Sequence, residues 1–135
     1  MNQAIIALLV KEAKKARRQA YAPYSHFQVG AALLCSDGNI FSGCNIENAS
    51  YPAGNCAERT AVFKAVSAGR KDFRAIAIAG GKEEGALELC PPCGICRQVL
   101  AEFCEKDFQI ILVTDDEHYQ TYPLEQLLPL SFHLF

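Results

Sequence analysis

The sequence carries almost no net charge. Its 13 lysine and arginine residues are nearly balanced by 15 aspartate and glutamate residues, so the formal charge at pH 7 is −2. A protein that binds nucleic acid usually presents a basic face, and this balance therefore argues against a nucleic-acid partner. The one basic cluster, Lys11 to Arg18, fits the solvated face of a helix better than a track for a polynucleotide.

The sequence also has no internal repeat, linker or low-complexity segment. We therefore expect residues 1–135 to form a single domain. The apolar stretch from Asn2 to Val10 follows no positive charge and contains no small-residue cleavage site. It predicts an amphipathic helix and not a secretory segment, with one face formed by Ile5, Leu8, Leu9, Ala13 and Ala16. We expect a cytoplasmic protein with no membrane partner, because a reducing cytosol keeps its seven cysteines available as thiols.

Histidine is scarce, with only three residues in the chain. His118 and His133 have no partner at metal-ligand spacing, and we expect them, like His26, in surface loops. Cysteine, in contrast, falls into a ligand pattern: Cys56 stands alone, and Cys93 and Cys96 form a Cys-x-x-Cys pair. Three protein ligands leave the fourth position of a tetrahedral Zn²⁺ free for water, which is the arrangement of a catalytic site.

Glu58 follows the first of these ligands by two residues. Helical runs are expected over residues 57–68 and 94–104, so Cys56 and Cys93 each open a helix whose first N–H groups are unpaired. Two helix N-termini are therefore expected to meet at one metal, with Glu58 beside it and not bound to it. The alternative role for Glu58 is to stabilise the helix N-terminus, worth about 0.3–1 kcal/mol.

Two arginines adjoin the predicted ligands. Three thiolates on one divalent cation give a net negative centre, which weakens its power to acidify water unless the charge is offset. Arg59 and Arg97 are the candidate donors to sulfur that would offset this charge.

Two other interpretations of the cysteines stay open. A lone Cys-x-x-Cys is typical of a thioredoxin-like redox pair, but such a pair gives Glu58 no role. A structural zinc site needs a fourth protein ligand, for which Cys44, Cys90 and Cys104 are available. We interpret these three, with Cys35, as small core residues.

The remaining pattern predicts an α/β protein. Strands are expected over residues 27–35, 39–44, 73–79 and 108–114, with a hairpin turn at residues 36–38 and a Gly80-Gly81 turn after the third strand. A last helical segment is expected near residues 123–128. The order of these elements predicts a mixed sheet with helices on both faces.

Five motifs together resemble the small, homotetrameric cytidine deaminases. These motifs are Tyr-Ala-Pro-Tyr-Ser at 21–25, Phe-Gln-Val-Gly-Ala-Ala-Leu at 27–33, Gly-Cys-Asn-Ile-Glu-Asn-Ala at 43–49, Asn-Cys-Ala-Glu-Arg-Thr at 55–60 and Pro-Cys-Gly-Ile-Cys-Arg-Gln at 92–98. The resemblance implies a three-layer α/β/α sandwich with a mixed five-stranded sheet, a homotetramer and one Zn²⁺ per subunit. It also implies hydrolytic deamination of cytidine and 2′-deoxycytidine with release of ammonia, as in pyrimidine salvage.

The resemblance also implies roles for individual residues. Phe27 would line the pyrimidine pocket, and Ala57 would contact substrate. Asn45 and Glu47 would hydrogen-bond the sugar hydroxyls. An amide and a carboxylate two residues apart in an extended segment project to the same side and can bind a diol together. Phe132 would reach the pocket of a neighbouring subunit. The residues alone leave another role open for each: a core position for Phe27, turn chemistry with an exposed charge for Asn45 and Glu47, and an adhesive apolar tail for Phe132.

These residues predict a mechanism in which Glu58 takes a proton from a zinc-polarised water and passes it to N3 of cytosine. Glu58 later helps to protonate the departing amine. Alternative substrates with the same zinc core are a nucleotide, a free base or a cytosine-containing antibiotic. A polynucleotide editor or a non-catalytic zinc module that binds RNA is the alternative from another class. The sequence has no glycine loop that cradles phosphate and no basic, aromatic-lined track, which argues against the nucleotide and the editor.

Overall fold

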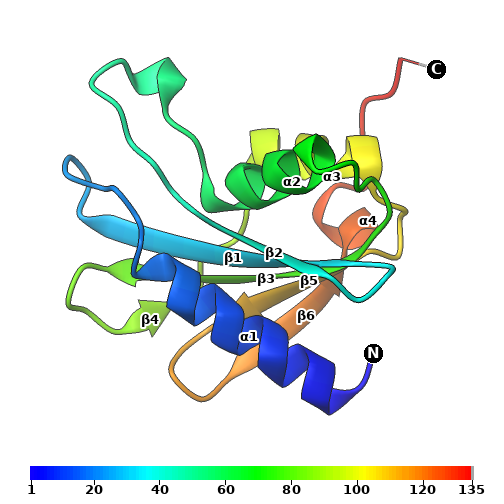
Figure 1. The fold of residues 1–135 in the computed structure, drawn as a ribbon, viewed down its shortest axis with the longest axis horizontal. Helices are drawn as coiled ribbons and strands as arrows, with labels where there is room; N and C mark the ends of the chain where they lie inside the picture. Colours follow the sequence, from blue (N-terminus) through cyan, green and yellow to red (C-terminus); the bar gives the residue numbers. More distant parts are fainter. Residues whose placement is uncertain (135) are drawn as a thin grey trace.

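The computed structural model describes residues 1–134. Its elements follow the order α1 (Gln3–Arg17), β1 (Phe27–Cys35), β2 (Ile40–Cys44), a 3₁₀ turn (Tyr51–Ala53), α2 (Ala57–Ser67), β3 (Phe73–Lys82), β4 (Leu87–Glu88), α3 (Gly94–Phe103), β5 (Gln109–Val113), β6 (Tyr119–Pro123) and α4 (Leu124–Leu127). Figure 1 shows α1 on one side of the sheet and α2, α3 and α4 on the other. This is the predicted three-layer α/β/α arrangement.

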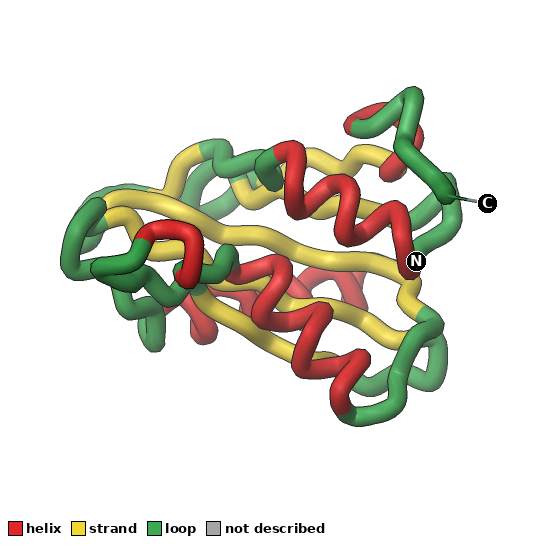
Figure 2. The backbone as a smooth tube through the Cα atoms, turned by 90° about the horizontal axis from the view of Figure 1, so that it is seen from above, coloured by secondary structure: helices red, strands yellow, loops and turns green. Residues whose placement is uncertain are grey.

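The strands form one mixed sheet with the order β2-β1-β3-β5-β6. The pair β3 and β5 is parallel and the other neighbours are antiparallel. The predicted number of strands was too low, because the two-residue β4 pairs with β3 outside this order and makes six strands within residues 1–134. Figure 2 shows the helices lying along the strands, with the loops gathered at the ends of the sheet.

Alternate residues of the central strands face opposite helical layers, as the period of two in a strand requires. Leu33, Ile76 and Ile110 pack toward α2 and α3 in the larger core cluster. Ala32, Ala77 and Ile111 pack toward α1 in the smaller cluster. Because helices cover both faces of the sheet, the central strands consist almost entirely of apolar residues. The apolar run at residues 108–113 predicted such a strand, buried on both sides.

Two glycines allow the helices to lie directly on the sheet. A Cβ atom added to Gly30 of β1 would stand 2.1 Å from the carbonyl oxygen of Ala13 in α1. A Cβ atom added to Gly43 of β2 would stand 2.5 Å from the backbone nitrogen of Ala61 in α2. Since real Cβ atoms do not approach so closely, glycine at these two positions lets α1 lie close against β1 and α2 close against β2.

Two details of the predicted pattern were wrong. Helix α1 buries Ile6 together with Leu9, whereas Leu8 is 45% exposed. Gly80 and Gly81 do not form a turn but continue β3, where Gly81 pairs with Leu87. No helix within the described residues is long and apolar enough to cross a membrane.

Candidate metal centre and catalytic site

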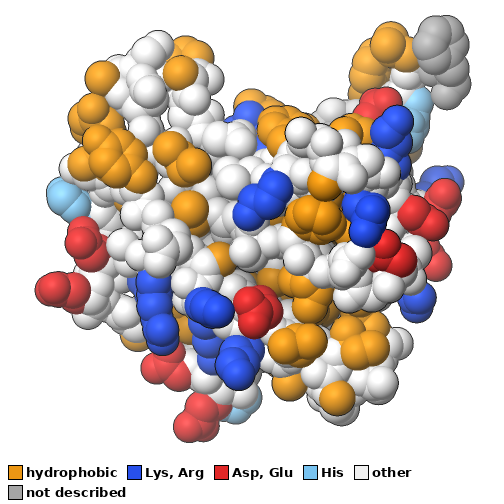
Figure 3. Space-filling model, in the orientation of Figure 1, with side chains coloured by type: hydrophobic (Ala, Val, Ile, Leu, Met, Phe, Trp, Pro, Cys, Tyr) orange, Lys and Arg blue, Asp and Glu red, His pale blue; other side chains and the backbone are white. Residues whose placement is uncertain are grey.

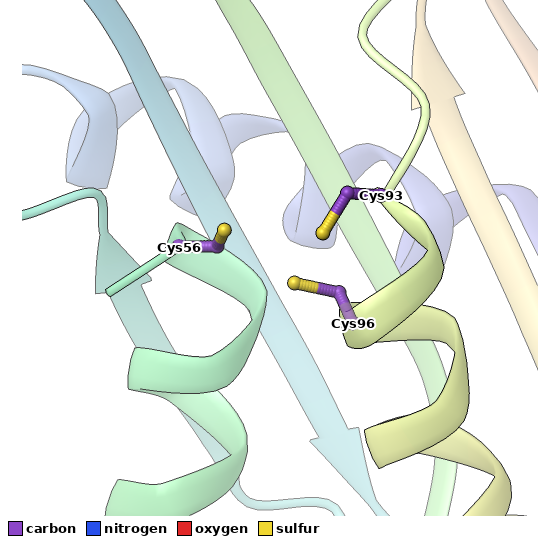
Figure 4. Close-up of side chains that lie close together, drawn as sticks. All are labelled: Cys56, Cys93 and Cys96. Carbon is purple, nitrogen blue, oxygen red and sulfur yellow. The ribbon is translucent and has the colours of Figure 1, made fainter. Parts of the chain in front are cut away.

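The three predicted ligands meet at one point. The sulfur atoms of Cys56, Cys93 and Cys96 all lie within 4.8 Å of one another. Figure 4 shows Cys56 at the start of α2 and Cys93 and Cys96 at the start of α3, with their sulfur atoms directed toward a common centre. Cys96 is buried, Cys56 is half-buried and Cys93 is exposed, so the site opens to solvent on one side.

Helix starts provide this geometry. Cys56 is the N-cap of α2 and Cys93 is the N-cap of α3, and both have extended backbone. Neither cysteine makes a side-chain capping hydrogen bond, since its sulfur points to the shared centre. The positive ends of two helix dipoles therefore face the thiol cluster, which favours its ionised form.

The electrostatics of the cluster fit a bound cation. A hydrogen bond from Cys96, helped by Arg59 and Cys93, lowers the pKa of Cys56 to about 5. The same bond, together with burial, raises the pKa of Cys96. The protein alone thus stabilises the Cys56 thiolate well, and ionising the neighbouring Cys96 requires added positive charge. A soft divalent cation such as Zn²⁺ supplies that charge and matches three thiolate ligands.

Arg59 is the arginine that contacts sulfur. Its Nη2 atom donates to Cys56 Sγ at 3.3 Å, and its buried Nε atom has no hydrogen-bond partner within residues 1–134. The prediction for Arg97 was wrong in its contacts, because the Arg97 guanidinium donates to backbone carbonyls. Its Nε bonds Pro92 O at 2.8 Å and its Nη1 bonds Leu127 O at 2.7 Å. Arg97 therefore holds the backbone just before Cys93 against α4.

Glu58 is the one charged residue among the described residues that is buried, with 5% of its surface exposed. Burial raises the pKa of Glu58 to about 7, and the nearby Cys56 thiolate adds to the increase. A carboxyl group whose pKa lies near neutral pH can both accept and donate a proton, which is the requirement for a general acid–base group. A helix-stabilising acid has no need of such burial.

Within residues 1–134, no fourth Cys, His, Asp or Glu side chain joins the thiol trio. The structural-zinc interpretation of Cys44, Cys90 or Cys104 as a fourth ligand therefore finds no support. Cys90 and Cys104 pack at the edge of the larger core cluster, and burial raises the pKa of each thiol to about 12. One coordination position is left for water or substrate, as a catalytic zinc site requires.

A cleft of about 510 Å³ opens next to Cys56. Its lining includes Asn45, Glu47 and Arg59, so the predicted sugar-binding pair shares this cleft with Cys56, one of the three predicted ligands. Its volume lies in the range of small-molecule sites. Figure 3 shows hydrophobic side chains on the lobe of residues 46–54, at the upper left, which forms one wall of the cleft.

Two polar residues of the cleft, Asn45 and Glu47, are held in place by hydrogen bonds. Asn45 Nδ2 donates to Phe27 O at 2.8 Å, and Asn45 Oδ1 accepts from Val29 N at 2.9 Å. An amide has a second N–H and a second lone pair, which remain for a ligand. Glu47 Oε1 accepts from the backbone nitrogens of Tyr24 and Ser25 at 3.0 and 3.1 Å, and Ser25 Oγ donates to Glu47 Oε2. The Ser25 bond is the main cause that lowers the pKa of Glu47.

The other predicted residues have mixed surroundings. Phe27 is half-buried and packs against the larger core cluster, and its ring approaches Gly80 and thus Cys90. Ala57 is buried between Cys56 and Glu58. Phe132 is 67% exposed and exchanges backbone bonds with the Gln98 side chain of α3. The three histidines are exposed, as expected.

Sequence reasoning missed several residues that support the site. Ser25 and Tyr24 bind Glu47 from 22 and 23 residues away, a pairing that no local pattern reveals. Tyr51 lines the cleft, and Asn55 connects to Thr60 beside Cys56. Asn55 and Thr60 belong to the motif at 55–60, and their position on either side of the ligand Cys56 is the signal that could have identified them.

A thiol trio, an unligated buried carboxyl group and an adjoining polar cleft define the class of zinc-dependent nucleobase deaminases. Residues 4–112 match the family model described as "Cytidine and deoxycytidylate deaminase zinc-binding region". The chain belongs to this family, and its cofactor is Zn²⁺.

Individual relatives agree along almost the full length. The chain is 51% identical to a cytidine deaminase of Halalkalibacterium halodurans over 93% of this chain and 92% of that protein. It is also 51% identical to a cytidine deaminase of Sporosarcina psychrophila, over 92% and 88% of the two chains. The crystal structure of cytidine deaminase from Burkholderia pseudomallei superposes with a TM-score of 0.86 at 43% identity, covering 98% of this chain and 100% of that one.

Proposed function

We propose that this protein hydrolyses cytidine and 2′-deoxycytidine to uridine and 2′-deoxyuridine, with release of ammonia. The observation that carries the proposal is Glu58, which is buried and has a pKa near neutral. It follows by two residues the ligand Cys56, which lines a cleft together with a polar pair suited to a sugar. Family membership and the cytidine deaminase relatives support the same activity. The role fits pyrimidine salvage in the cytoplasm.

Cys56, Cys93 and Cys96 would hold the Zn²⁺ ion, which when bound supplies Lewis acidity that makes a water molecule a better nucleophile. Glu58 accepts the proton that this water loses and delivers it to N3 of the ring, so that C4 becomes electrophilic. The water oxygen then bonds to C4. Glu58 moves a proton from this new hydroxyl group to the amino group, which leaves as ammonia while the C4–O bond becomes the carbonyl of the uracil ring. Acid–base help of this kind contributes about 10²–10⁴ in rate.

The remaining residues orient the nucleoside. Glu47 presents a fixed carboxylate to a sugar hydroxyl, because Tyr24 and Ser25 already hold its oxygens. The Asn45 amide uses one N–H and one oxygen lone pair to bind β1. Its second N–H and second lone pair bind the sugar. We assign Phe27 and Ala57 to contact with the base and Arg59 to charge compensation at sulfur.

A substrate panel tests the proposal. Purified protein with measured zinc content is mixed with cytidine, deoxycytidine, cytosine, CMP and a cytosine-containing nucleoside antibiotic, and the release of ammonia is followed. We expect turnover of the two nucleosides and little turnover of CMP, because the Glu47 carboxylate repels a phosphate and Arg59, the basic residue in the cleft lining, is bound to Cys56 Sγ. Zinc-loaded protein that leaves both nucleosides unchanged would overturn the proposal.

We further assign the protein to homotetramers. Helices α2 and α3 carry large exposed apolar residues, Phe63 at 46% and Ile95 at 63%, and the exposed Phe132 is held to α3 by Gln98. Exposed apolar groups on adjacent helices favour burial against another copy. Light scattering coupled to size-exclusion chromatography should give about four times the chain mass of 14.8 kDa. A monomer at micromolar concentration would contradict this assignment.

A further inference from the structure

Helix α2 has no ordinary cap at its start. The N-cap position belongs to Cys56, which makes no side-chain capping bond. In most helices the N-cap side chain binds a free backbone N–H and so fixes its own direction. Because the Cys56 sulfur serves the metal centre, its direction must be fixed by other contacts.

The residues on either side of Cys56 provide such contacts. Asn55 Nδ2 donates to Thr60 Oγ1 at 3.2 Å, and Thr60 Oγ1 donates to Cys56 O at 3.1 Å. The backbone nitrogen of Thr60 binds the same carbonyl oxygen at 2.9 Å. These bonds close a ring around the ligand, from the residue before it to the residue one helical turn after it.

Asn55 is also tied to the sugar-binding segment. Its backbone nitrogen donates to Ile46 O at 2.8 Å, and its carbonyl oxygen accepts from Ile46 N at 2.9 Å. Ile46 stands between Asn45 and Glu47. One residue therefore joins the sugar-binding pair to the start of the helix that carries Cys56 and Glu58.

We propose that Asn55 and Thr60 are positioning residues that orient Cys56 and Glu58 relative to the bound nucleoside through the bond chain Asn55 Nδ2, Thr60 Oγ1 and Cys56 O. This inference rests on the proposed deamination for its catalytic part, and on the thiol cluster alone for its metal part. Neither residue belongs to the thiol trio, and both bind the backbone around Cys56, so both act through Cys56 and the first turn of α2.

Two matched variants separate the hydroxyl group of Thr60 from its packing. Thr60 Cβ lies 2.9 Å from where a Cβ atom on Gly43 would stand, so the side chain is packed tightly against β2. Thr60→Val keeps this shape and removes the hydroxyl, whereas Thr60→Ser keeps the hydroxyl and removes the methyl group. Asn55→Ala removes the Asn55 Nδ2 group at the other end of this chain of hydrogen bonds.

The measurements are zinc release to a coloured chelator and kcat and KM for cytidine. We expect Thr60→Val and Asn55→Ala to release zinc roughly fivefold faster than the wild type, which corresponds to one hydrogen bond, and to lower kcat more than they raise KM. Thr60→Ser should stay close to the wild type in both. The double variant Asn55→Ala/Thr60→Val should be no worse than either single variant, because both interrupt one chain of bonds.

Packing alone would give the opposite order, with Thr60→Ser worse than Thr60→Val, and that order would overturn the proposal. Additive losses in the double variant, or wild-type zinc release in all three single variants, would overturn it as well. Zinc release does not depend on turnover. A wild type that holds zinc but does not deaminate cytidine would refute the proposed function and leave the metal part of this test intact.

Discussion

The sulfur atoms of the three thiols in the metal centre all lie within 4.8 Å of one another, but their environments differ. Cys56 receives the Arg59 hydrogen bond and has a low pKa, whereas Cys96 is buried and has a high one. Each is needed, because removing one thiolate leaves two ligands and an open site. We expect Cys56→Ala, Cys93→Ala and Cys96→Ala each to lose zinc and deaminase activity together.

Cys44 offers the matched control for this experiment, since it is a half-buried cysteine outside the trio. Cys44→Ala should keep one zinc per chain in elemental analysis. Stoichiometric, tightly held zinc in any of the three ligand variants would remove that residue from the ligand set.

Glu47 gives a prediction for pH dependence. Its hydrogen bonds lower its pKa below the ordinary value of 4.5, so the ionised form that accepts these bonds persists above pH 4.5 and is lost only as the pH falls through the lower, folded value. Sugar binding through Glu47 should therefore not change between pH 7.5 and 5.5. Calorimetric titration of cytidine into Glu58→Gln protein measures this without turnover and without the titration of Glu58.

The matched variant for that measurement is Ser25→Ala, in the same Glu58→Gln background. It removes the main cause of the lowered pKa of Glu47 and should weaken cytidine binding across the pH range. A tenfold fall in affinity between pH 7.5 and 5.5 without the Ser25 change would contradict the assignment of a low pKa to Glu47.

Helix α1 packs so closely on β1 that there is no room for a side chain at Gly30. Gly30→Ala places a methyl group 2.1 Å from Ala13 O, so α1 must move away from the sheet. Overpacking of this kind typically costs about 1–3 kcal/mol in the free energy of unfolding. Thermal or denaturant unfolding of the zinc-loaded protein should show this loss.

Gly94→Ala is the control for this substitution, because a Cβ atom there would meet nothing within 4 Å and would lie in the first turn of α3. It should leave stability unchanged or slightly higher, as alanine is the better helix former. Equal stability of the Gly30→Ala protein and the wild type would show that the close approach of α1 is not required.

The same elements show which features the sequence predicts well. Helix starts at Cys56 and Cys93 and the buried strand β5 follow from local patterns, and the structure confirms them. Strand β6 was missed because it is a largely exposed edge strand without an apolar alternation. Gly80-Gly81 was misread because a glycine pair usually marks a turn. Here the pair lets Cys90 and Ala86 approach the strand closely.

At the level of the assembled site, local patterns identify the ligands but not their support. The thiol trio was predictable because each cysteine stands at a recognisable helix start. The contacts of Glu47 with Ser25, and of Arg97 with Leu127, join segments 22 and 30 residues apart and depend on the tertiary structure. Such pairs become visible only when the chain is folded.

Phe132 yields a prediction for the assembly. In the single chain it is 67% exposed and is held only through its backbone by Gln98, so its ring has no role in this subunit's own cleft. If it stacks in a neighbouring subunit's pocket, Phe132→Ala should raise KM for cytidine about five- to 100-fold, the range of base–aromatic stacking. Leu130→Ala, at a residue that is 94% exposed, is the control and should leave KM unchanged. An unchanged KM in Phe132→Ala would exclude the cross-subunit contact.

Glu58→Gln separates metal binding from proton transfer in a single protein. The substitution keeps the shape of the side chain and removes its ability to carry a proton, while the thiol trio is untouched. Elemental analysis and steady-state assay with cytidine should give one zinc per chain and a kcat lowered by about 10²–10⁴. A Glu58→Gln protein with full zinc and near-normal kcat would contradict the assignment of Glu58 as the acid–base group.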